Sequence, residues 1–323
     1  MLKVGVIGAG YLGKIHIQQW KTISDIELIG FFDIDKNRAA EIEAEMQLKS
    51  FETAEELIEK CDALDIVSST STHFYYAQKA IKHSKNLFIE KPMAANITDA
   101  KSIVEMVNEA QVKCQIGHIE RFNPAFTAIK DKNIHPLFIE GHRLAKFNPR
   151  GNDVSVILDL MIHDIDIILS LVKSDIKRIA ASGVNVISET SDIANVRLEF
   201  ANGCVANLTA SRISLKNMRK LRMFQKDAYI SVDFLEKKTE IVTIEEANGE
   251  IGIMDFPIEL PDGKKKIIHL DFPEIENNNA IKMELELFRD SILNNTTTSV
   301  MAEDGYLAMD IAYQILEKIE GKN

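Results

Sequence analysis

The first 33 residues read MLKVGVIGAGYLGKIHIQQWKTISDIELIGFFD. A short apolar strand pattern ends at Ile7, the glycine pattern Gly8-Ala9-Gly10-Tyr11-Leu12-Gly13 follows directly, and a helical pattern continues to Trp20. In this pattern the first glycine permits a tight turn, the second lets the backbone approach a pyrophosphate, and the third allows close packing of helix on strand. The helix N-terminus then faces the phosphates with its unpaired N–H groups.

A glycine pattern alone also fits an ordinary glycine-rich turn, so a second feature has to decide. Asp33 ends the next apolar run, twenty residues after Gly13, where a carboxylate accepts hydrogen bonds from an adenosine ribose. The combination predicts a dinucleotide site. Because this carboxylate repels a 2′-phosphate and Asp35 adds a second charge, NAD is expected in preference to NADP. The predicted cofactor residues of this stretch are Gly8, Gly10, Tyr11, Leu12, Gly13 and Asp33.

Up to about residue 118, short β-rich runs alternate with helix-length segments. These runs are apolar on both faces, which indicates parallel βαβ units with helices on both sides of the sheet. Thr53 and Thr98 are expected to cap two of the helices. Residues 1–120 are therefore predicted to form an α/β NAD-binding domain with a Rossmann-type, doubly wound parallel sheet. The expected strands are residues 4–7, 26–32, 64–68, 87–90 and 112–116.

Beyond residue 120 the pattern changes to one long helix over 157–173, followed by consecutive strand-like runs. Residues 196–200 and 205–209 alternate polar and apolar side chains around a turn at 201–203, which indicates a hairpin. Helical patterns return at 281–293 and 303–319. Residues 121–323 are therefore predicted to form a second α/β domain with a mostly antiparallel sheet.

Composition narrows the class of protein. A chain of 323 residues with net charge −11 suggests about two domains, and its acidic surface disfavours nucleic-acid and anionic-membrane partners. The N-terminus has no signal-peptide pattern, and no apolar stretch reaches the roughly 20 residues needed to span a bilayer. Three widely spaced cysteines without CxxC spacing indicate reduced thiols, so a cytoplasmic location is expected.

Two further segments carry side chains suited to chemistry. Glu90-Lys91-Pro92 ends a predicted strand at the sheet edge where ligands bind, and the ammonium group of Lys91 can hold a hydroxyl or a developing alkoxide. On the predicted long helix, Asp159, His163 and Asp166 are spaced to share one face. That face fits a solvated polar stripe, a metal site or a general base. With a nicotinamide inferred, the imidazole as base is favoured, and no metal is expected.

Taken together, these motifs resemble the Gfo/Idh/MocA oxidoreductases over essentially the whole chain. The resemblance implies a Rossmann domain followed by a C-terminal α/β domain with an open, mostly antiparallel sheet that binds substrate and supports a homodimer or homotetramer. It implies that Lys91, Asp159 and His163 contact the substrate near the nicotinamide, with His163 as the base. It adds Thr70, His73 and Glu90 to the cofactor residues, since the segment ending at Thr72-His73 is similar to the family's T-P-x-x-H.

Several positions depart from the family pattern, which makes the shape of the pocket less transferable than its chemistry. Met161 replaces a usual glycine, and the T-P-x-x-H proline is absent. His118 to Pro124 resembles the branch that contains UDP-N-acetylglucosamine 3-dehydrogenase-like proteins, which implies a nucleotide-linked amino sugar as substrate. Asn-Pro at 123–124 fits a helix start equally well. The predicted substrate residues are Arg121, Asn123 and Asp166, and the arginines considered for a diphosphate are Arg121, Arg143, Arg150 and Arg212.

Three classes of function remain. The favoured one is NAD-dependent transfer of a hydride from a secondary hydroxyl of a sugar or nucleotide sugar. The others are an NAD-dependent glycosidase of the same family and a non-catalytic protein that senses NAD or a sugar. A sensor needs no base, so the presence of Lys91, Asp159 and His163 favours an enzyme.

Overall fold

The computed structural model describes residues 1–148, 154–247, 255–259 and 261–321. The chain divides into two compact units, residues 1–122 with 278–310, and residues 123–277 with 311–323. In this division the chain leaves the first unit after residue 122 and returns to it at residue 278. Helix α8 (Ala280–Leu293) belongs to the first unit because it buries Leu285 and Phe288 in the same core as Trp20.

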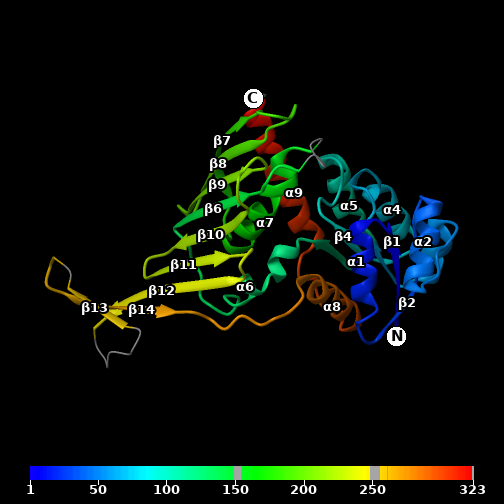
Figure 1. Cartoon of the computed structure of the whole chain (residues 1–323), viewed down its shortest axis with the longest axis horizontal. Helices are drawn as coiled ribbons and strands as arrows, with labels where there is room; N and C mark the ends of the chain where they lie inside the picture. Colours follow the sequence, from blue (N-terminus) through cyan, green and yellow to red (C-terminus); the bar gives the residue numbers. More distant parts are fainter. Residues whose placement is uncertain (149–153, 248–254, 260, 322–323) are drawn as a thin grey trace. The chain divides into compact units, whose positions relative to one another are not determined.

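The first unit contains a parallel sheet of five strands in the order β2-β1-β3-β4-β5 (Figure 1). Every residue of β3 and β5 is buried, so both sheet faces are covered, and the predicted α/β, doubly wound sheet is confirmed. Its strands are β1 (Leu2–Ile7), β2 (Ile26–Phe32), β3 (Ala63–Ile66), β4 (Asn86–Glu90) and β5 (Cys114–Gly117). Besides α8, its helices are α1 (Tyr11–Trp20), α2 (Lys36–Met46), α3 (Ala54–Lys60), α4 (Thr70–Lys82), α5 (Ile97–Ala110) and the 3-10 helix η1 (Ile119–Phe122).

Side-chain caps set where the helices of this unit begin. The Thr53 hydroxyl accepts a hydrogen bond from the Glu56 N–H at 3.3 Å and caps α3, as predicted. Helix α5 is capped by Asn96, whose Oδ1 accepts from the Asp99 N–H at 2.9 Å, and the prediction of Thr98 as its cap is wrong. The helix starts at Ile97, so Thr98 already lies in the first turn.

The second unit contains a nine-stranded sheet in the order β13-β14-β12-β11-β10-β6-β9-β8-β7 (Figure 1). Strands β6 and β9 pair in parallel and every other described pair is antiparallel, which confirms the mostly antiparallel sheet. Burial alternates along β8, so one face packs on the core of the unit and the other stays accessible. The strands are β6 (Phe138–Leu144), β7 (Ile176–Val184), β8 (Ile193–Phe200), β9 (Val205–Ser211), β10 (Met218–Phe224), β11 (Ala228–Asp233), β12 (Lys238–Glu246), β13 (Asp255–Glu259) and β14 (Lys265–Asp271).

The helix predicted over 157–173 has two parts. A π-helical turn, η2 (Ile157–Met161), precedes the α-helix α7 (Ile162–Leu171). The single α-helix predicted over 157–173 is thus observed as two segments, with Asp159 in the π-helical turn and His163 and Asp166 in α7. The remaining helices are α6 (Pro124–Thr127) and α9 (Ala302–Ile319), which contributes its first residues to the first unit and its last to the second.

Two features bear on the predicted cellular setting. Cys61, Cys114 and Cys204 are all buried free thiols, and burial raises the pKa of Cys61 to about 12. None of the helices that the structure describes is long and apolar enough to cross a bilayer.

Candidate functional site

A pocket of about 270 Å³ lies where β1, β2 and β3 end. The strand order reverses between β1 and β3, and such a switch point is where open α/β sheets bind ligands. Five of the predicted cofactor residues line it: Gly8, Gly10, Tyr11, Leu12 and Asp33. The other lining residues are Ile7, Phe32, Ile34, Arg38, Val67, Ser68, Ser69, Thr72 and Tyr76.

The three glycines shape this pocket in different ways. Gly8 has φ +99°, and a Cβ there would lie 2.6 Å from the Ser68 N. A Cβ on Gly13 would overlap the carbonyl oxygen of Gly8, so this glycine lets α1 pack against the turn. A Cβ on Gly10 would meet nothing within 4 Å, which leaves room for a ligand. Close packing at two glycines and open space at the third are what a bound pyrophosphate requires.

The residues at the start of α1, Gly10, Tyr11 and Leu12, line this pocket. Among the residues that the structure describes, no side chain caps this helix, and its first turn holds no acidic residue. The N–H groups and the positive end of the helix dipole are therefore available to phosphates. The chain thus fits a dinucleotide in this pocket.

Asp33 is held in a fixed orientation at the pocket wall. Its Oδ2 accepts a hydrogen bond from the Ala9 N–H at 2.7 Å, and its Oδ1 accepts from the Asp35 N–H at 2.9 Å. The half-exposed guanidinium of Arg38 lies 3.6 Å from Asp33 Oδ1 and 3.5 Å from Asp35 Oδ2. Arg38 was not predicted from the sequence, because it reaches the pocket only where the start of α2 lies beside the second strand.

Cofactor preference gives a direct test of Asp33. Wild-type protein should bind NADH more tightly than NADPH, because one carboxylate–phosphate repulsion at 4 Å costs about 1–4 kcal/mol, or about one to three decades in affinity. Asp33→Ser should lower the ratio of the NADPH dissociation constant to the NADH dissociation constant, because it removes the repulsion and leaves Arg38 able to pair with a 2′-phosphate. Asp35→Asn, which keeps a side-chain oxygen for capping α2, should change it much less. Calorimetry with both cofactors measures the ratio, and equal or tighter NADPH binding by the wild type would contradict the assignment.

The Glu90-Lys91-Pro92 segment begins at the last residue of β4, and the Lys91–Pro92 peptide bond is cis. Glu90 is buried and turns inward: its Oε2 accepts from the Lys91 N–H at 3.1 Å, and its Oε1 lies 3.2 Å from Nε2 of His16. His73 is also buried, with Nδ1 3.0 Å from the Pro92 carbonyl oxygen and Nε2 3.0 Å from that of Ser68. Burial lowers the pKa of His73, and its contacts with the two carbonyl oxygens oppose this shift, so the ring lies between the two loops and contacts both. Glu90 and His73 therefore support the segment from inside.

The second unit carries the other predicted catalytic residues. Asp159 lies in the π-helical turn and His163 in the first turn of α7, and both are partly exposed. Asp164 and Asp166 are buried. Rare π-helical turns occur often at functional sites, so the local geometry fits a functional segment.

Several polar residues that the sequence proposed for the substrate are engaged inside the fold. Arg143 is buried and donates from Nη2 to Asp164 at 2.7 Å. Asn123 caps α6 through the Ala125 N–H at 3.1 Å and donates to the Phe234 carbonyl at 3.0 Å, as the helix-start alternative predicts. Arg121 lies 3.4 Å from Asp304. Arg150 lies outside the described residues.

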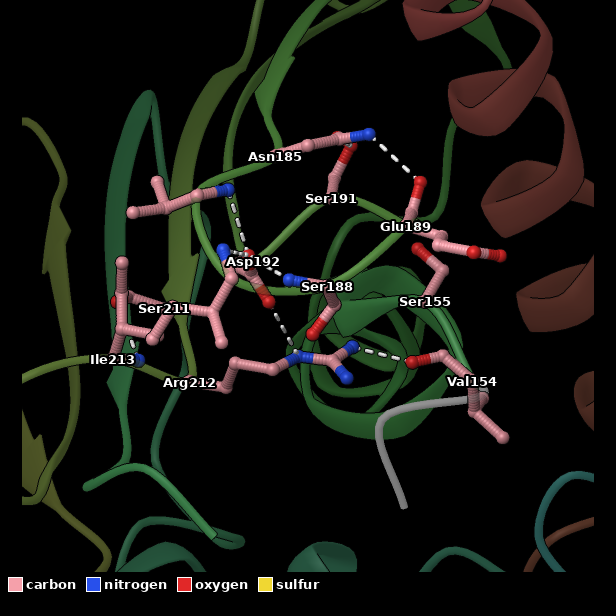
Figure 2. Close-up of polar contacts among 12 residues, drawn as sticks. Val154, Ser155, Asn185, Ser188, Glu189, Ser191, Asp192, Ser211, Arg212 and Ile213 are labelled. Atoms are coloured by element: carbon pink, nitrogen blue, oxygen red, sulfur yellow. Dashed lines mark hydrogen bonds and ion pairs between the residues drawn. The ribbon is translucent and has the colours of Figure 1, made fainter. Parts of the chain in front are cut away.

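Arg212 is also buried, within a network of the second unit (Figure 2). Its Nε lies 3.8 Å from Asp192 Oδ1, and its Nη2 donates to the Val154 carbonyl oxygen. Asp192 Oδ2 accepts from the backbone N–H groups of Val186, Ile187 and Ser188 at 2.7–3.0 Å. Arg212 therefore joins a loop to the start of the π-helical segment.

A glycine turn, a carboxylate at the end of the second strand and a pocket at the switch point are typical of a dinucleotide-binding Rossmann domain. Residues 2–118 match the family model described as "Oxidoreductase family, NAD-binding Rossmann fold", and residues 115–230 match the GFO/IDH/MocA C-terminal domain. The chain therefore belongs to the Gfo/Idh/MocA family and is an NAD-dependent oxidoreductase that acts on a CH–OH group.

Individual relatives agree with this assignment. A UDP-N-acetylglucosamine 3-dehydrogenase of Acidithiobacillus ferrooxidans is 39% identical over 241 residues, which cover 74% of this chain and 76% of that protein. A solved structure of an enzyme with that name from the same species matches with TM-score 0.89 and 32% identity, over 99% of this chain and 98% of that one. A myo-inositol 2-dehydrogenase of Thermotoga maritima is 24% identical over 340 residues, 99% of this chain and 97% of that protein.

Proposed function

We propose that the chain oxidises a ring hydroxyl of a nucleotide-linked amino sugar, such as a UDP-N-acetylhexosamine, to a ketone. The similarity to the Acidithiobacillus ferrooxidans enzyme, 39% identity over about three quarters of both proteins, carries this proposal. The myo-inositol 2-dehydrogenase is less similar, at 24% identity, and makes a simple polyol the second candidate. No specific observation favours the glycosidase or the sensor.

The proposed roles follow from the chemistry of the side chains. When bound, NAD accepts the hydride from the carbon that carries the hydroxyl. Lys91 holds the hydroxyl oxygen and stabilises its developing negative charge, and His163 takes the hydroxyl proton. Asp159 binds a neighbouring hydroxyl and orients the ring. Of the arginines considered for the diphosphate, Arg143 and Arg212 are held in buried ion pairs, which leaves Arg121, itself partly exposed and paired with Asp304, and Arg150 as the candidates.

The setting proposed for this reaction is a homodimer or homotetramer in the cytoplasm. Three buried free thiols support a reducing compartment. The sheet of the second unit presents an accessible face, on which the β8 residues Asn195 and Arg197 are exposed, and self-association is one way to cover such a face.

Steady-state kinetics test the substrate. With NAD in excess, kcat/KM for UDP-N-acetylglucosamine should exceed that for free N-acetylglucosamine or myo-inositol by at least about two decades, because the remote nucleotide supplies binding energy that holds the reacting hydroxyl. UDP alone should inhibit competitively. If a free sugar or inositol matches the nucleotide sugar, the nucleotide is not recognised and the simple polyol becomes the substrate class.

A further inference from the structure

Beneath the Glu90-Lys91 turn, the first unit buries a cluster of four titratable side chains that are far apart in sequence. They come from four elements around one point of the core: His16 of α1, Asp65 of β3, Glu90 of β4 and Glu284 of α8. His16, Asp65 and Glu284 are 0% exposed, and Glu90 is 8% exposed. Buried charges are costly unless they are paired, so the protonation states of these groups have to balance one another.

His16 lies between two of the carboxylates. Its Nδ1 is 2.9 Å from Asp65 Oδ2, and its Nε2 is 3.2 Å from Glu90 Oε1. The Trp20 indole N–H also donates to Asp65 Oδ2, at 2.8 Å. Burial alone would lower the pKa of His16, but the two carboxylates outweigh it and raise this pKa well above 6.5. His16 therefore hydrogen-bonds Asp65 through Nδ1 and lies beside Glu90 with Nε2, and the two carboxylates favour its imidazolium form.

Glu284 takes no part in the pairing of His16 with Asp65 and Glu90. Neither of its carboxyl oxygens has a hydrogen-bond partner among the described residues. One of its carboxyl oxygens lies within 4.8 Å of a ring nitrogen of His16 and of a carboxyl oxygen of Glu90. Its main-chain carbonyl accepts a hydrogen bond from Gln115 Nε2 at 2.7 Å, which holds α8 at this residue.

An ionised Glu284 would place a third negative charge beside a single imidazolium, inside the core. Burial, followed by the negative charge of Glu90, raises the pKa of Glu284 well above its ordinary value, while His16 opposes the shift. Asp65 adds in the same direction as Glu90. A proton on Glu284 removes the third negative charge and makes this side chain a potential hydrogen-bond donor.

Charged groups on the other neighbouring elements have partners of their own. Helix η1, which also packs against α8, carries Glu120 and Arg121, and Arg121 pairs with Asp304 at 3.4 Å. On α8 itself, the partly exposed Lys282 and Glu286 lie 3.8 Å apart. The groups that face Glu284 are thus His16, Asp65 and Glu90.

Glu90 connects the cluster to Lys91, the residue proposed to hold the substrate hydroxyl. Glu90 Oε2 accepts from the Lys91 N–H, and a Cβ on Gly117 would lie 2.8 Å from Glu90 Oε1, so this carboxylate is closely confined. We propose that Glu284 is a positioning residue that keeps its proton in the folded protein and, as a neutral acid beside Glu90, holds the Glu90-Lys91 turn in place. The consequence for turnover rests on the proposed role of Lys91, whereas the proton on Glu284 does not.

Unfolding as a function of pH tests the proton independently of any substrate. Above its ordinary pKa of 4.5, Glu284 is ionised in the unfolded chain and protonated in the folded one, so stability falls as pH rises towards the folded-state pKa. Between pH 5 and 6.5, the unfolding equilibrium constant of the wild type should rise about tenfold more per pH unit than that of Glu284→Gln. His16 is protonated in both states over most of this window and contributes little.

The matched control is Glu286→Gln, which removes a partly exposed carboxylate two residues away on the same helix and should keep the wild-type slope. Glu284→Met serves as a second neutral variant, because it removes the charge without supplying a donor. The proposal would be overturned if the unfolding equilibrium constant had the same pH dependence in the wild type and in both Glu284 variants. If neither variant folds, infrared spectroscopy of the wild type at pH 6 decides: the expected result is the carbonyl stretch of a buried carboxylic acid, and its absence overturns the proposal.

Turnover supplies a readout that a purely structural role would not change. In the wild type, kcat should fall on the alkaline side as Glu284 ionises, and this limb should move to higher pH in Glu284→Gln but not in Glu286→Gln. Suppose that the alkaline fall of kcat is the same in Glu284→Gln as in the wild type, while unfolding shows the expected pH dependence. Glu284 would then be protonated in the folded protein but would have no positioning role. Stoichiometric divalent metal in the purified protein would overturn both, because a cation would then balance the carboxylates. None of these outcomes depends on which sugar is the substrate.

Discussion

Replacing His163 by alanine is expected to lower kcat by about two to four decades, the usual range for a lost general base, and to leave NADH affinity within about twofold. The two effects should separate because the pocket that fits the dinucleotide is lined entirely by residues of the first unit, whereas His163 belongs to the second. Rapid-quench or initial-rate kinetics measure the first quantity, and fluorescence titration with NADH measures the second.

His135→Ala is the matched control, because His135 is an exposed histidine of the same unit and should behave like the wild type. Full activity in His163→Ala would remove the proposed base. Activity that is abolished by a chelator and restored by a divalent ion would instead favour the metal alternative for Asp159 and His163.

Replacing Lys91 by methionine is expected to lower kcat/KM by about two to three decades, the usual cost of losing one group that stabilises a developing oxyanion. Methionine keeps most of the apolar stem and removes the ammonium group, so the loss is electrostatic rather than steric. KM should rise as well, because Lys91 is proposed to hold the substrate hydroxyl before reaction. NADH affinity and thermal stability should change little.

Lys85→Met controls for the general effect of removing a lysine, since Lys85 precedes β4 and Lys91 follows it. The control should keep wild-type kinetics. A Lys91→Met enzyme with wild-type kcat/KM would show that the ammonium group takes no part in the reaction, whatever the sugar.

Local sequence determined most of the first unit. The strand predicted over residues 26–32 is observed with the same limits, and the glycine turn lies where the 8–13 pattern predicts it. Such features depend on short-range sterics and on apolar runs that two covered sheet faces require, so neighbouring residues suffice to define them. Local sequence defined helix starts less well. Asn96 and Thr98 are both good capping residues, and α5 is capped by Asn96.

Spacing along the chain did not determine the geometry of the Asp159–Asp166 segment. The pattern predicts one continuous α-helix, but the chain adopts a π-helical turn at Ile157–Met161 before α7 begins. Arg143 and Asp164 likewise read as separate surface or site charges in sequence, whereas β6 and α7 bring them into a buried ion pair. Such pairs form only when distant elements pack, and local preference does not encode them.

The sequence by itself determined the fold class and the dinucleotide motif and proposed candidates for catalysis, because these depend on local patterns and on the chemistry of single side chains. Only the tertiary structure returned residues 278–310 to the first unit and set Glu284 beside His16 and Glu90. In sequence, Glu284 is one acidic residue on an amphipathic helix. Its protonation depends on a dry core and on charges contributed by three other elements, and those exist only once the chain has folded.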